Sequence, residues 1–226
     1  MKEATILGFI IIVATAISQP LQAQSLDHTF DIYAVNVVKT TPFQNPSTGF
    51  GVYLGNGTVI TAFHVIGRWG FLKKPHVLIA GQNLPARIIK EGSRQVDLTL
   101  LSVVEARLPV SLQMRRNPLC QHAPTAGEKV IVVGPGKTTL SQIISPLLIH
   151  QAFRKSYSTL ISEVAGSGSG VFDAARGCLV GIITHKIEKY DYREEEGEVI
   201  EYPDGYAGYF IPASQIADFI PAEFRF

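Results

Sequence analysis

The sequence is poor in several features that would point to particular classes of protein. It has two cysteines in 226 residues, so it can form at most one disulfide. Charged residues make up 17% of the chain and the net charge is +1, which gives no reason to expect nucleic acid or an anionic membrane surface as a partner. The six histidines are scattered, and no phosphate loop or repeat is present. We therefore expect no metal and no cofactor.

What the chain does have is enough apolar sequence for one globular domain or two packed subdomains, at 46% hydrophobic residues. Its first 23 residues predict a secretory signal peptide. Lys2 precedes an apolar run at 6–17, which is too short to span a bilayer, and Ala23 precedes the expected cleavage point. An uncleaved anchor is the alternative. We expect a secreted or periplasmic domain of residues 24–226, with no membrane contact once the signal is removed.

The two cysteines are Cys120 and Cys178. In an exported protein they permit a single disulfide. Two buried free thiols are the alternative, because the sequence does not say whether the two Cα atoms lie within bridging distance.

Most of the chain is predicted to form short β-strands. A Gly-Asn-Gly turn at 55–57 joins two β-rich segments and predicts a hairpin. Pro212 and the spacing of Ile216, Phe219 and Ile220 predict a short helix over 212–220. A hydrophilic stretch at 186–205 is either an exposed hairpin or a solvated charged loop, and we favour the loop. The remaining expected β-rich segments lie at 32–38, 77–80, 85–90, 96–104, 126–134, 138–150, 156–162 and 206–211. The pattern is all-β, in two halves joined by the proline-containing connection 107–124.

A glycine-rich stretch, residues 165–173 with the sequence AGSGSGVFD, stands out in the second half. It precedes two strand-like segments, 171–172 and 179–183, around a turn at 174–177. A serine in such a loop, with free amides beside it, provides both a nucleophile and an oxyanion hole for acyl transfer. A plain glycine-rich turn is the alternative interpretation of this stretch taken alone.

Two further residues are individually weak candidates. His64 lies among apolar residues, where a structural histidine is more common than a catalytic one. Asp97 is the second residue of an apolar run, where a carboxylate must be solvated, capped or paired. With Ser167 they fall in the order His, Asp, Ser, with the first two in one half and the serine in the other.

In these residues the chain resembles the chymotrypsin/trypsin-like serine peptidases. Residues 61–64, Thr-Ala-Phe-His, are similar to the family's Thr-Ala-x-His motif, and 97–101 resemble its Asp-x-x-Leu-Leu motif. Residues 167–172, Ser-Gly-Ser-Gly-Val-Phe, resemble Ser-Gly-Ser-Pro-Val-Phe. Residues 179–182 and 208–212 look like the bacterial HtrA-type and glutamyl-endopeptidase-type branch. The resemblance extends over about 48–220.

The resemblance implies a fold and a reaction. The fold is two six-stranded antiparallel β-barrels, at about 30–108 and 125–212, with a short helix at 212–220 and no PDZ domain after Phe226. The substrate is a polypeptide. Ser167 would be the nucleophile, His64 its general base and Asp97 the acid that orients the imidazole. Thr184 occupies the position whose hydroxyl supports the aspartate.

The oxyanion hole implied by the family uses the backbone N–H groups of Ala165 and Ser167. Here the chain departs from the pattern, because Ala165 replaces a glycine, Gly166 an acid or asparagine, and Gly170 a proline. A catalytically impaired, peptide-binding protein on the same fold is therefore the alternative function. A shifted register would make Ser169 the nucleophile, but it moves residues 171–172 off the motif.

The resemblance also places a primary substrate pocket. Ile161 and Ser162 would form its base and wall, with Thr184 and His185 on the other side. Ile161 favours a small apolar side chain, whereas Ser162 and His185 favour a polar or acidic one. Of these we expect the apolar preference. No acid stands where cleavage after lysine or arginine would need one.

Overall fold

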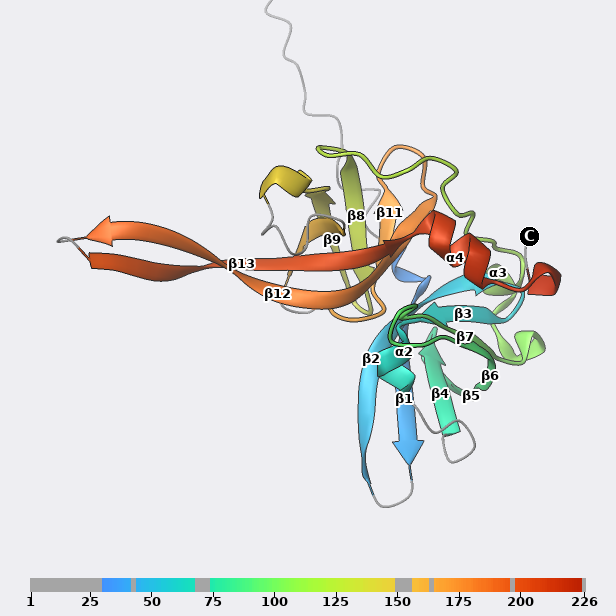
Figure 1. The fold of residues 1–226 in the computed structure, drawn as a ribbon. Coiled ribbons are helices and arrows are strands. Elements are labelled where there is room, and N and C mark those ends of the chain that lie inside the picture. Colours follow the sequence, from blue (N-terminus) through green and yellow to red (C-terminus); the bar gives the residue numbers. More distant parts are fainter. Residues whose placement is uncertain are drawn as a thin grey trace, which may run out of the picture.

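The computed structural model describes residues 30–41, 44–67, 74–148, 156–162, 165–195 and 198–224, with the backbone alone at 41, 44–47, 189–195 and 198–204. The expected signal peptide, 1–23, lies outside these residues. Within the described part of the chain, no helix has the length and apolar character needed to cross a membrane. The protein consists mostly of strands in two curled antiparallel sheets, with few helices (Figure 1). This is the predicted trypsin fold.

The first sheet has the strand order β5-β4-β1-β2-β3-β7-β6. It has seven strands where the resemblance implies six, because residues 82–91 form two strands separated at Ala86, where one strand was expected at 85–90. The part before Ala86 pairs with β4 and the part after it pairs with β7, so one bent segment joins both edges of the sheet. The strands are β1 (Ala34–Thr41), β2 (Gln44–Gly55), β3 (Thr58–Thr61), β4 (Lys74–Ile79), β5 (Gln82–Pro85), β6 (Arg87–Glu91) and β7 (Thr99–Ser102).

The predicted hairpin is confirmed as β2–β3. Its turn residues Gly55, Asn56 and Gly57 all have positive φ, at 119°, 50° and 70°. Glycine and asparagine tolerate this conformation at low cost. The turn fixes the register that pairs Gly51 with Thr61.

The second sheet has the strand order β10-β13-β12-β11-β8-β9. The N–H of Ile144 donates to the Ser158 carbonyl, 2.8 Å away, and brings the end of β9 to β10. Residues 186–195 and 198–205 belong to the long β12–β13 hairpin that extends from this sheet, so the favoured interpretation as a loop is wrong (Figure 1). The strands are β8 (Lys129–Gly134), β9 (Lys137–Gln142), β10 (Tyr157–Ile161), β11 (Gly170–Asp173), β12 (Leu179–Glu195) and β13 (Glu198–Pro212).

The connection between the sheets contains η2 (Glu105–Arg107) and α3 (Val110–Gln113), and it is tied to the second sheet. Leu119 forms a parallel bridge with Leu179 at the start of β12. Cys120 and Cys178 form a disulfide with Cα atoms 5.1 Å apart and a sequence separation of 58. Closing a loop of that length stabilises the folded chain by about 4 kcal/mol in the chain-entropy account.

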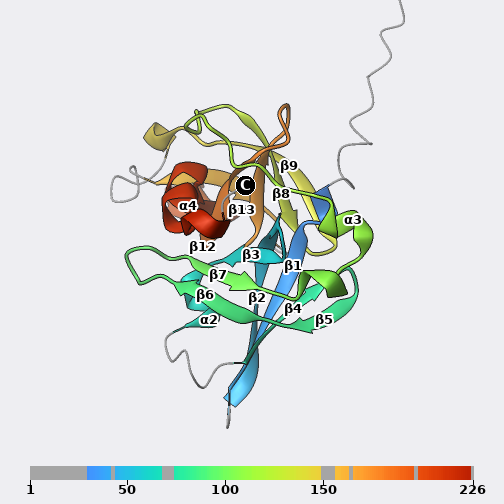
Figure 2. The same cartoon turned by 90° about the vertical axis from the view of Figure 1, so that its right-hand side faces the viewer.

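The C-terminal helix α4 (Ala213–Phe219) follows Pro212, as the sequence predicts, and lies beside the junction of the two sheets (Figures 1 and 2). Its buried Ile216 and Phe219 join the larger core cluster, which contains side chains of both sheets. The Nζ of Lys90 on β6 donates to the carbonyl of Phe219, 2.7 Å away. The helix therefore attaches the end of the second half to the first sheet. Two short 3-10 turns complete the described elements, η3 (Pro146–Leu148) and η5 (Ala222–Phe224).

Candidate active site

Strand pairing brings His64 and Asp97 together. Thr61, the last residue of β3, pairs with Thr99, the first residue of β7. His64 lies three residues after Thr61, in the single-turn helix α2 (Phe63–Ile66). Asp97 was expected within a strand at 96–104, but it lies two residues before β7 begins. The shared register therefore places the two side chains at the same edge of the first sheet.

The pair is doubly hydrogen bonded. Asp97 Oδ2 lies 2.8 Å from His64 Nδ1, and Asp97 Oδ1 accepts from the backbone N–H of His64 at 2.9 Å. The hydrogen bond to the carboxylate raises the pKa of His64 above its ordinary 6.5, and this outweighs the lowering by burial. Burial alone raises the pKa of Asp97, but the hydrogen bonds from His64 outweigh it and the net pKa is below 3.8. Asp97 is thus an anion that holds the imidazole in one orientation.

A pH profile follows from this pair. A general base acts only when neutral, so we expect kcat/KM for peptide hydrolysis to rise with pH, with an inflection above 6.5. Removing the carboxylate charge in Asp97→Asn removes the stabilisation of the imidazolium, so the inflection should move to lower pH. Initial rates at low substrate over about pH 5–9 measure both inflections. An unshifted inflection in the variant would show that Asp97 does not set the pKa of His64.

The loop that carries Ser167 rests on the first sheet. The N–H of Phe50 on β2 donates to the Ser167 carbonyl at 2.9 Å. The Thr61 hydroxyl donates to the Phe50 carbonyl at 2.6 Å. Because Phe50 and Thr61 lie at the end of the sheet that carries His64, these contacts bring the serine loop to the histidine–aspartate pair. The structure therefore gathers all three predicted residues at the junction of the two sheets.

Gly168 makes this approach possible. Its φ is +94°, and a Cβ there would lie 1.7 Å from the Phe50 carbonyl oxygen. We expect Gly168→Ala to slow acylation of Ser167 at least about a hundredfold, because displacing a reacting group by about 1 Å costs that much. The matched control is Gly127→Ala, since Gly127 has φ +83° but no atom within 4 Å of the added Cβ. It should retain the wild-type rate and lose about 1 kcal/mol of stability. Stopped-flow acylation and urea unfolding of both variants separate the effect of the clash from that of backbone strain. Equal acylation rates in the two variants would contradict the role given to the clash with Phe50.

The Ser167 hydroxyl donates to the backbone carbonyl of Thr184, 3.0 Å away. Among the hydrogen bonds of the described residues, none joins Ser167 to His64. The Thr184 hydroxyl also has another partner than the resemblance implies: it lies 3.1 Å from His185 Nδ1, not against Asp97. Catalytic hydrogen bonds in free enzymes are often incomplete until substrate binds. The site is therefore in a resting arrangement in which the His64–Asp97 link of a triad is formed and the Ser167–His64 link is not.

The expected oxyanion donors are not equivalent. The N–H of Ala165 donates to the Ser162 carbonyl at 3.1 Å, so it is occupied within the chain. The N–H of Ser167 has no hydrogen bond within the described part of the structure. Gly166 does not have a positive φ, so this position does not use the freedom that glycine provides. One of the two predicted donors is thus available in this arrangement.

Ser169, the alternative nucleophile, is fully buried, and its Oγ accepts from the N–H of Gly166 at 3.1 Å. It supports the turn and does not face the histidine pair. This arrangement favours the predicted register with Ser167.

The residues expected around the substrate pocket line two hollows. Ile161 and Ser162 line one together with Leu140 and Ser141. Thr184 and His185 line another, of about 460 Å³, together with Tyr157 and Tyr209. The Ser162 hydroxyl is buried and has no partner among the described residues.

Of two further neighbours of the site, His185 was expected in the substrate pocket, whereas Phe50 was not predicted. The His185 ring lies 5.8 Å from that of His64, centroid to centroid. Phe50 holds the serine loop through its backbone N–H. Every residue except proline has this group, so the residue type at position 50 does not predict the contact. The glycines on either side of it, Gly49 and Gly51, were the signal available, since a Cβ at either would crowd valine side chains.

Two curled antiparallel sheets, with a histidine–aspartate pair beside a serine in a glycine-rich loop, define a serine-nucleophile hydrolase. The trypsin-like peptidase domain matches residues 48–182, more than half of the chain. The chain therefore belongs to the trypsin-like peptidases and is a serine endopeptidase. No curated protein sequence matches it.

Solved structures share this fold. The active form of the Rv3671c protease from M. tuberculosis has a TM-score of 0.58 at 16% identity, over 84% of this chain and 80% of that one. The serine endoprotease from Yersinia pestis has a TM-score of 0.55 at 19% identity, over 83% and 61%. The MamO protease domain from Magnetospirillum magneticum has a TM-score of 0.52 at 19% identity, over 86% and 98%. At these identities the likeness concerns the fold.

Proposed function

We propose that the protein is an exported endopeptidase that cleaves polypeptides through an acyl-enzyme on Ser167. His64 is the general base and Asp97 orients it. The observation that carries this assignment is the 2.8 Å hydrogen bond between His64 Nδ1 and Asp97, at the edge of the sheet on which the Ser167 loop rests.

The chemistry follows from the two nitrogens of the His64 ring. Asp97 holds the proton on Nδ1, so Nε2 keeps its lone pair and can accept the proton of Ser167. The hydroxyl leaves the Thr184 carbonyl, attacks the scissile carbonyl carbon and passes its proton to His64. The imidazolium then protonates the leaving amine, and water hydrolyses the acyl-enzyme by the same route. The N–H of Ser167 faces the oxyanion, and Ala165 joins it once its bond to Ser162 opens.

Two hydrogen bonds favour a second candidate function, a trypsin-fold protein that binds peptides without turning them over. They are the bonds from Ser167 to Thr184 and from Ala165 to Ser162, which occupy the nucleophile and one oxyanion donor. In this case both bonds persist when a peptide is bound.

Labelling with a fluorophosphonate separates the two functions. We expect covalent labelling of Ser167, identified by mass spectrometry, in the wild type and in Ser169→Ala, and loss of labelling in His64→Ala. A folded wild type that is neither labelled nor able to cleave casein would establish the non-catalytic alternative.

Profiling a peptide library with wild type and Ser167→Ala in parallel then tests the expected preference for a small apolar residue before the cleaved bond.

Export is a separate part of the proposal and rests on residues 1–23. Expression with these residues in a bacterial host should give a mature protein that begins at Gln24 in the periplasm or medium. An uncut N-terminus in the membrane fraction would indicate the anchor instead.

A further inference from the structure

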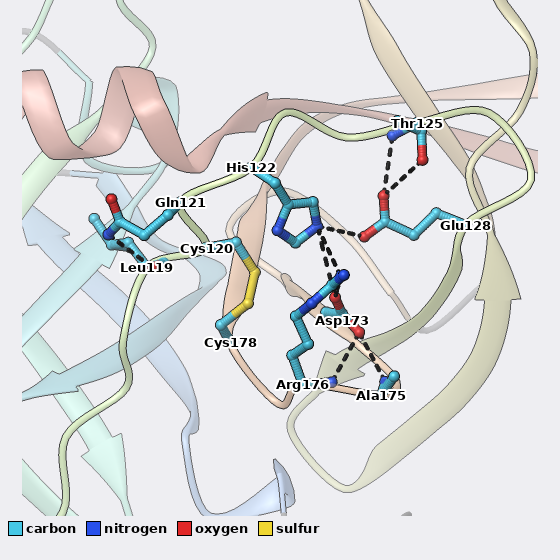
Figure 3. Close-up of a disulfide and its surroundings, with 10 residues drawn as sticks. All are labelled: Leu119, Cys120, Gln121, His122, Thr125, Glu128, Asp173, Ala175, Arg176 and Cys178. Carbon is cyan, nitrogen blue, oxygen red and sulfur yellow. Dashed lines mark hydrogen bonds and ion pairs between the residues drawn. A yellow bond between two sulfur atoms is a disulfide. The ribbon is translucent and has the colours of Figure 1, made fainter.

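A second group of reactive side chains surrounds the disulfide, apart from the active site (Figure 3). Cys120 and His122 come from the connection between the sheets. Asp173 and Cys178 come from the two ends of the turn between β11 and β12. Each residue offers one ligand atom, and these atoms all lie within 4.8 Å of one another. Asp173 is 2% exposed, so its carboxylate must be paired.

The four side chains match the ligand chemistry of zinc. Zn²⁺ takes thiolate, imidazole and carboxylate ligands in a tetrahedron with bonds of about 2.0–2.3 Å, so neighbouring ligand atoms lie roughly 3.3–3.8 Å apart. Gathering atoms that are already within 4.8 Å needs a contraction of about 1.5 Å at most, while the two sulfurs move apart once their bond is broken. While the disulfide exists, its sulfurs are not thiolates and cannot bind the ion in this way.

We propose that reducing the disulfide turns this cluster into a zinc site formed by Cys120, Cys178, His122 and Asp173. A dithiol supplies two electrons and two protons: the S–S bond breaks, two thiols form, and the dithiol becomes a disulfide. Zn²⁺ then replaces the two thiol protons, which leave to solvent. The site is independent of the peptidase mechanism proposed above.

His122 is already held as a zinc-binding histidine is. Its Nε2 lies 2.9 Å from Glu128 Oε1, and the other oxygen of Glu128 accepts from the N–H of Thr125 at 3.0 Å. Figure 3 shows the Nδ1 side of the ring facing the disulfide. A carboxylate on one ring nitrogen orients the other toward the metal and makes it a better ligand. We therefore assign Nδ1 as the ligand atom.

Arg176 occupies the cluster in the disulfide form. Its Nη1 lies 2.7 Å from Asp173 Oδ2 and 3.3 Å from His122 Nε2. The guanidinium thus supplies the positive charge that Asp173 needs when no metal is bound. Its side chain is 64% exposed and can leave toward solvent. Asp173 Oδ1 keeps its hydrogen bonds from the N–H groups of Ala175 and Arg176, so the carboxylate stays in position.

The disulfide form and the zinc form link the same two segments by different bonds. In the disulfide form, a covalent bond joins Cys120, in the segment between the sheets, to Cys178, in the turn between β11 and β12. In the zinc form, a metal ion bridges the same two residues. Reduced protein without metal lacks both, so zinc should restore the stability that reduction removes.

Cobalt binding tests the site, because thiolate ligands give Co²⁺ intense near-ultraviolet absorption. The full mature chain, without a histidine tag, is reduced with a dithiol, freed of it without oxygen and titrated with Co²⁺ and then Zn²⁺. We expect the thiolate band at one equivalent, its loss when Zn²⁺ displaces Co²⁺, and a higher Tm with zinc. The disulfide form and the reduced, alkylated form should give no band.

Variants identify the ligands. His122→Asn should weaken zinc binding at least about tenfold, the cost typical even of losing a supporting group. Arg176→Gln should strengthen it, while Arg87→Gln, an exposed arginine on β6, should leave it unchanged. Cys120→Ser/Cys178→Ser, which needs no reduction to lose the disulfide, should show no rise in Tm with zinc. The proposal is overturned if reduced wild type gives no thiolate band, or if His122→Asn binds zinc as tightly as wild type does.

Discussion

Ser167→Ala is expected to lower kcat for peptide hydrolysis by about a millionfold, the loss typical of removing the nucleophile of such a triad. The reason is that the remaining groups cannot form an acyl-enzyme, although the site still binds the peptide. KM should change little, since the hydroxyl contributes one hydrogen bond, to Thr184, in the resting protein. Hydrolysis of a fluorogenic peptide, with active-site titration of the wild type, measures the change.

Ser169→Ala is the control for this substitution, because it removes a hydroxyl two residues away in the same loop. It loses the hydrogen bond from Gly166 to Ser169 Oγ, so a small loss of activity through loop mobility is expected. If Ser169→Ala removed activity and Ser167→Ala kept it, the register of the nucleophile would be wrong.

Asp97→Asn should lower kcat by about four orders of magnitude while leaving the fold intact. The two hydrogen bonds of Asp97 explain the size of the effect. The backbone N–H of His64 needs an acceptor, so the asparagine oxygen takes the place of Oδ1 and the amide NH₂ faces Nδ1. The ring must then accept at Nδ1 and carry its proton on Nε2, where it cannot receive one from Ser167.

The control for this charge removal is Asp218→Asn, on the exposed surface of α4, which should retain wild-type kcat. The tautomer argument also has its own readout. Nitrogen-15 shifts of the imidazole should show the proton on Nδ1 in the neutral wild type and on Nε2 in Asp97→Asn. Full activity in the variant, or the same tautomer in both proteins, would contradict the role given to Asp97.

The sequence predicts best those features that short stretches determine. The turn at Gly55, Asn56 and Gly57 needs positive φ, and the residues that tolerate it are visible in the sequence. His64, Asp97 and Ser167 each lie in a short motif, and the register between β3 and β7 then brings the first two together. Such features depend on local conformation and on the pairing of neighbouring strands.

Other features depend on contacts that no short stretch reveals. Pro85 precedes the break between β5 and β6, but no short stretch shows that the two parts pair with strands at opposite edges of the sheet. The polar residues after Lys186 predict a loop, yet β12 and β13 pair through backbone groups that composition does not show. The Ser167 hydroxyl donates to the Thr184 carbonyl and the Thr184 hydroxyl pairs with His185, and both partners depend on the assembled site.

The hydrogen bond from the Phe50 N–H to the Ser167 carbonyl joins the two halves of the molecule. The position of the nucleophile therefore depends on how the two halves pack against each other. Partial opening between the halves would break this bond before either sheet melts. Inactivation by heat or urea should therefore run ahead of the loss of circular dichroism, and an assay of turnover would detect early damage to the fold that spectroscopy misses.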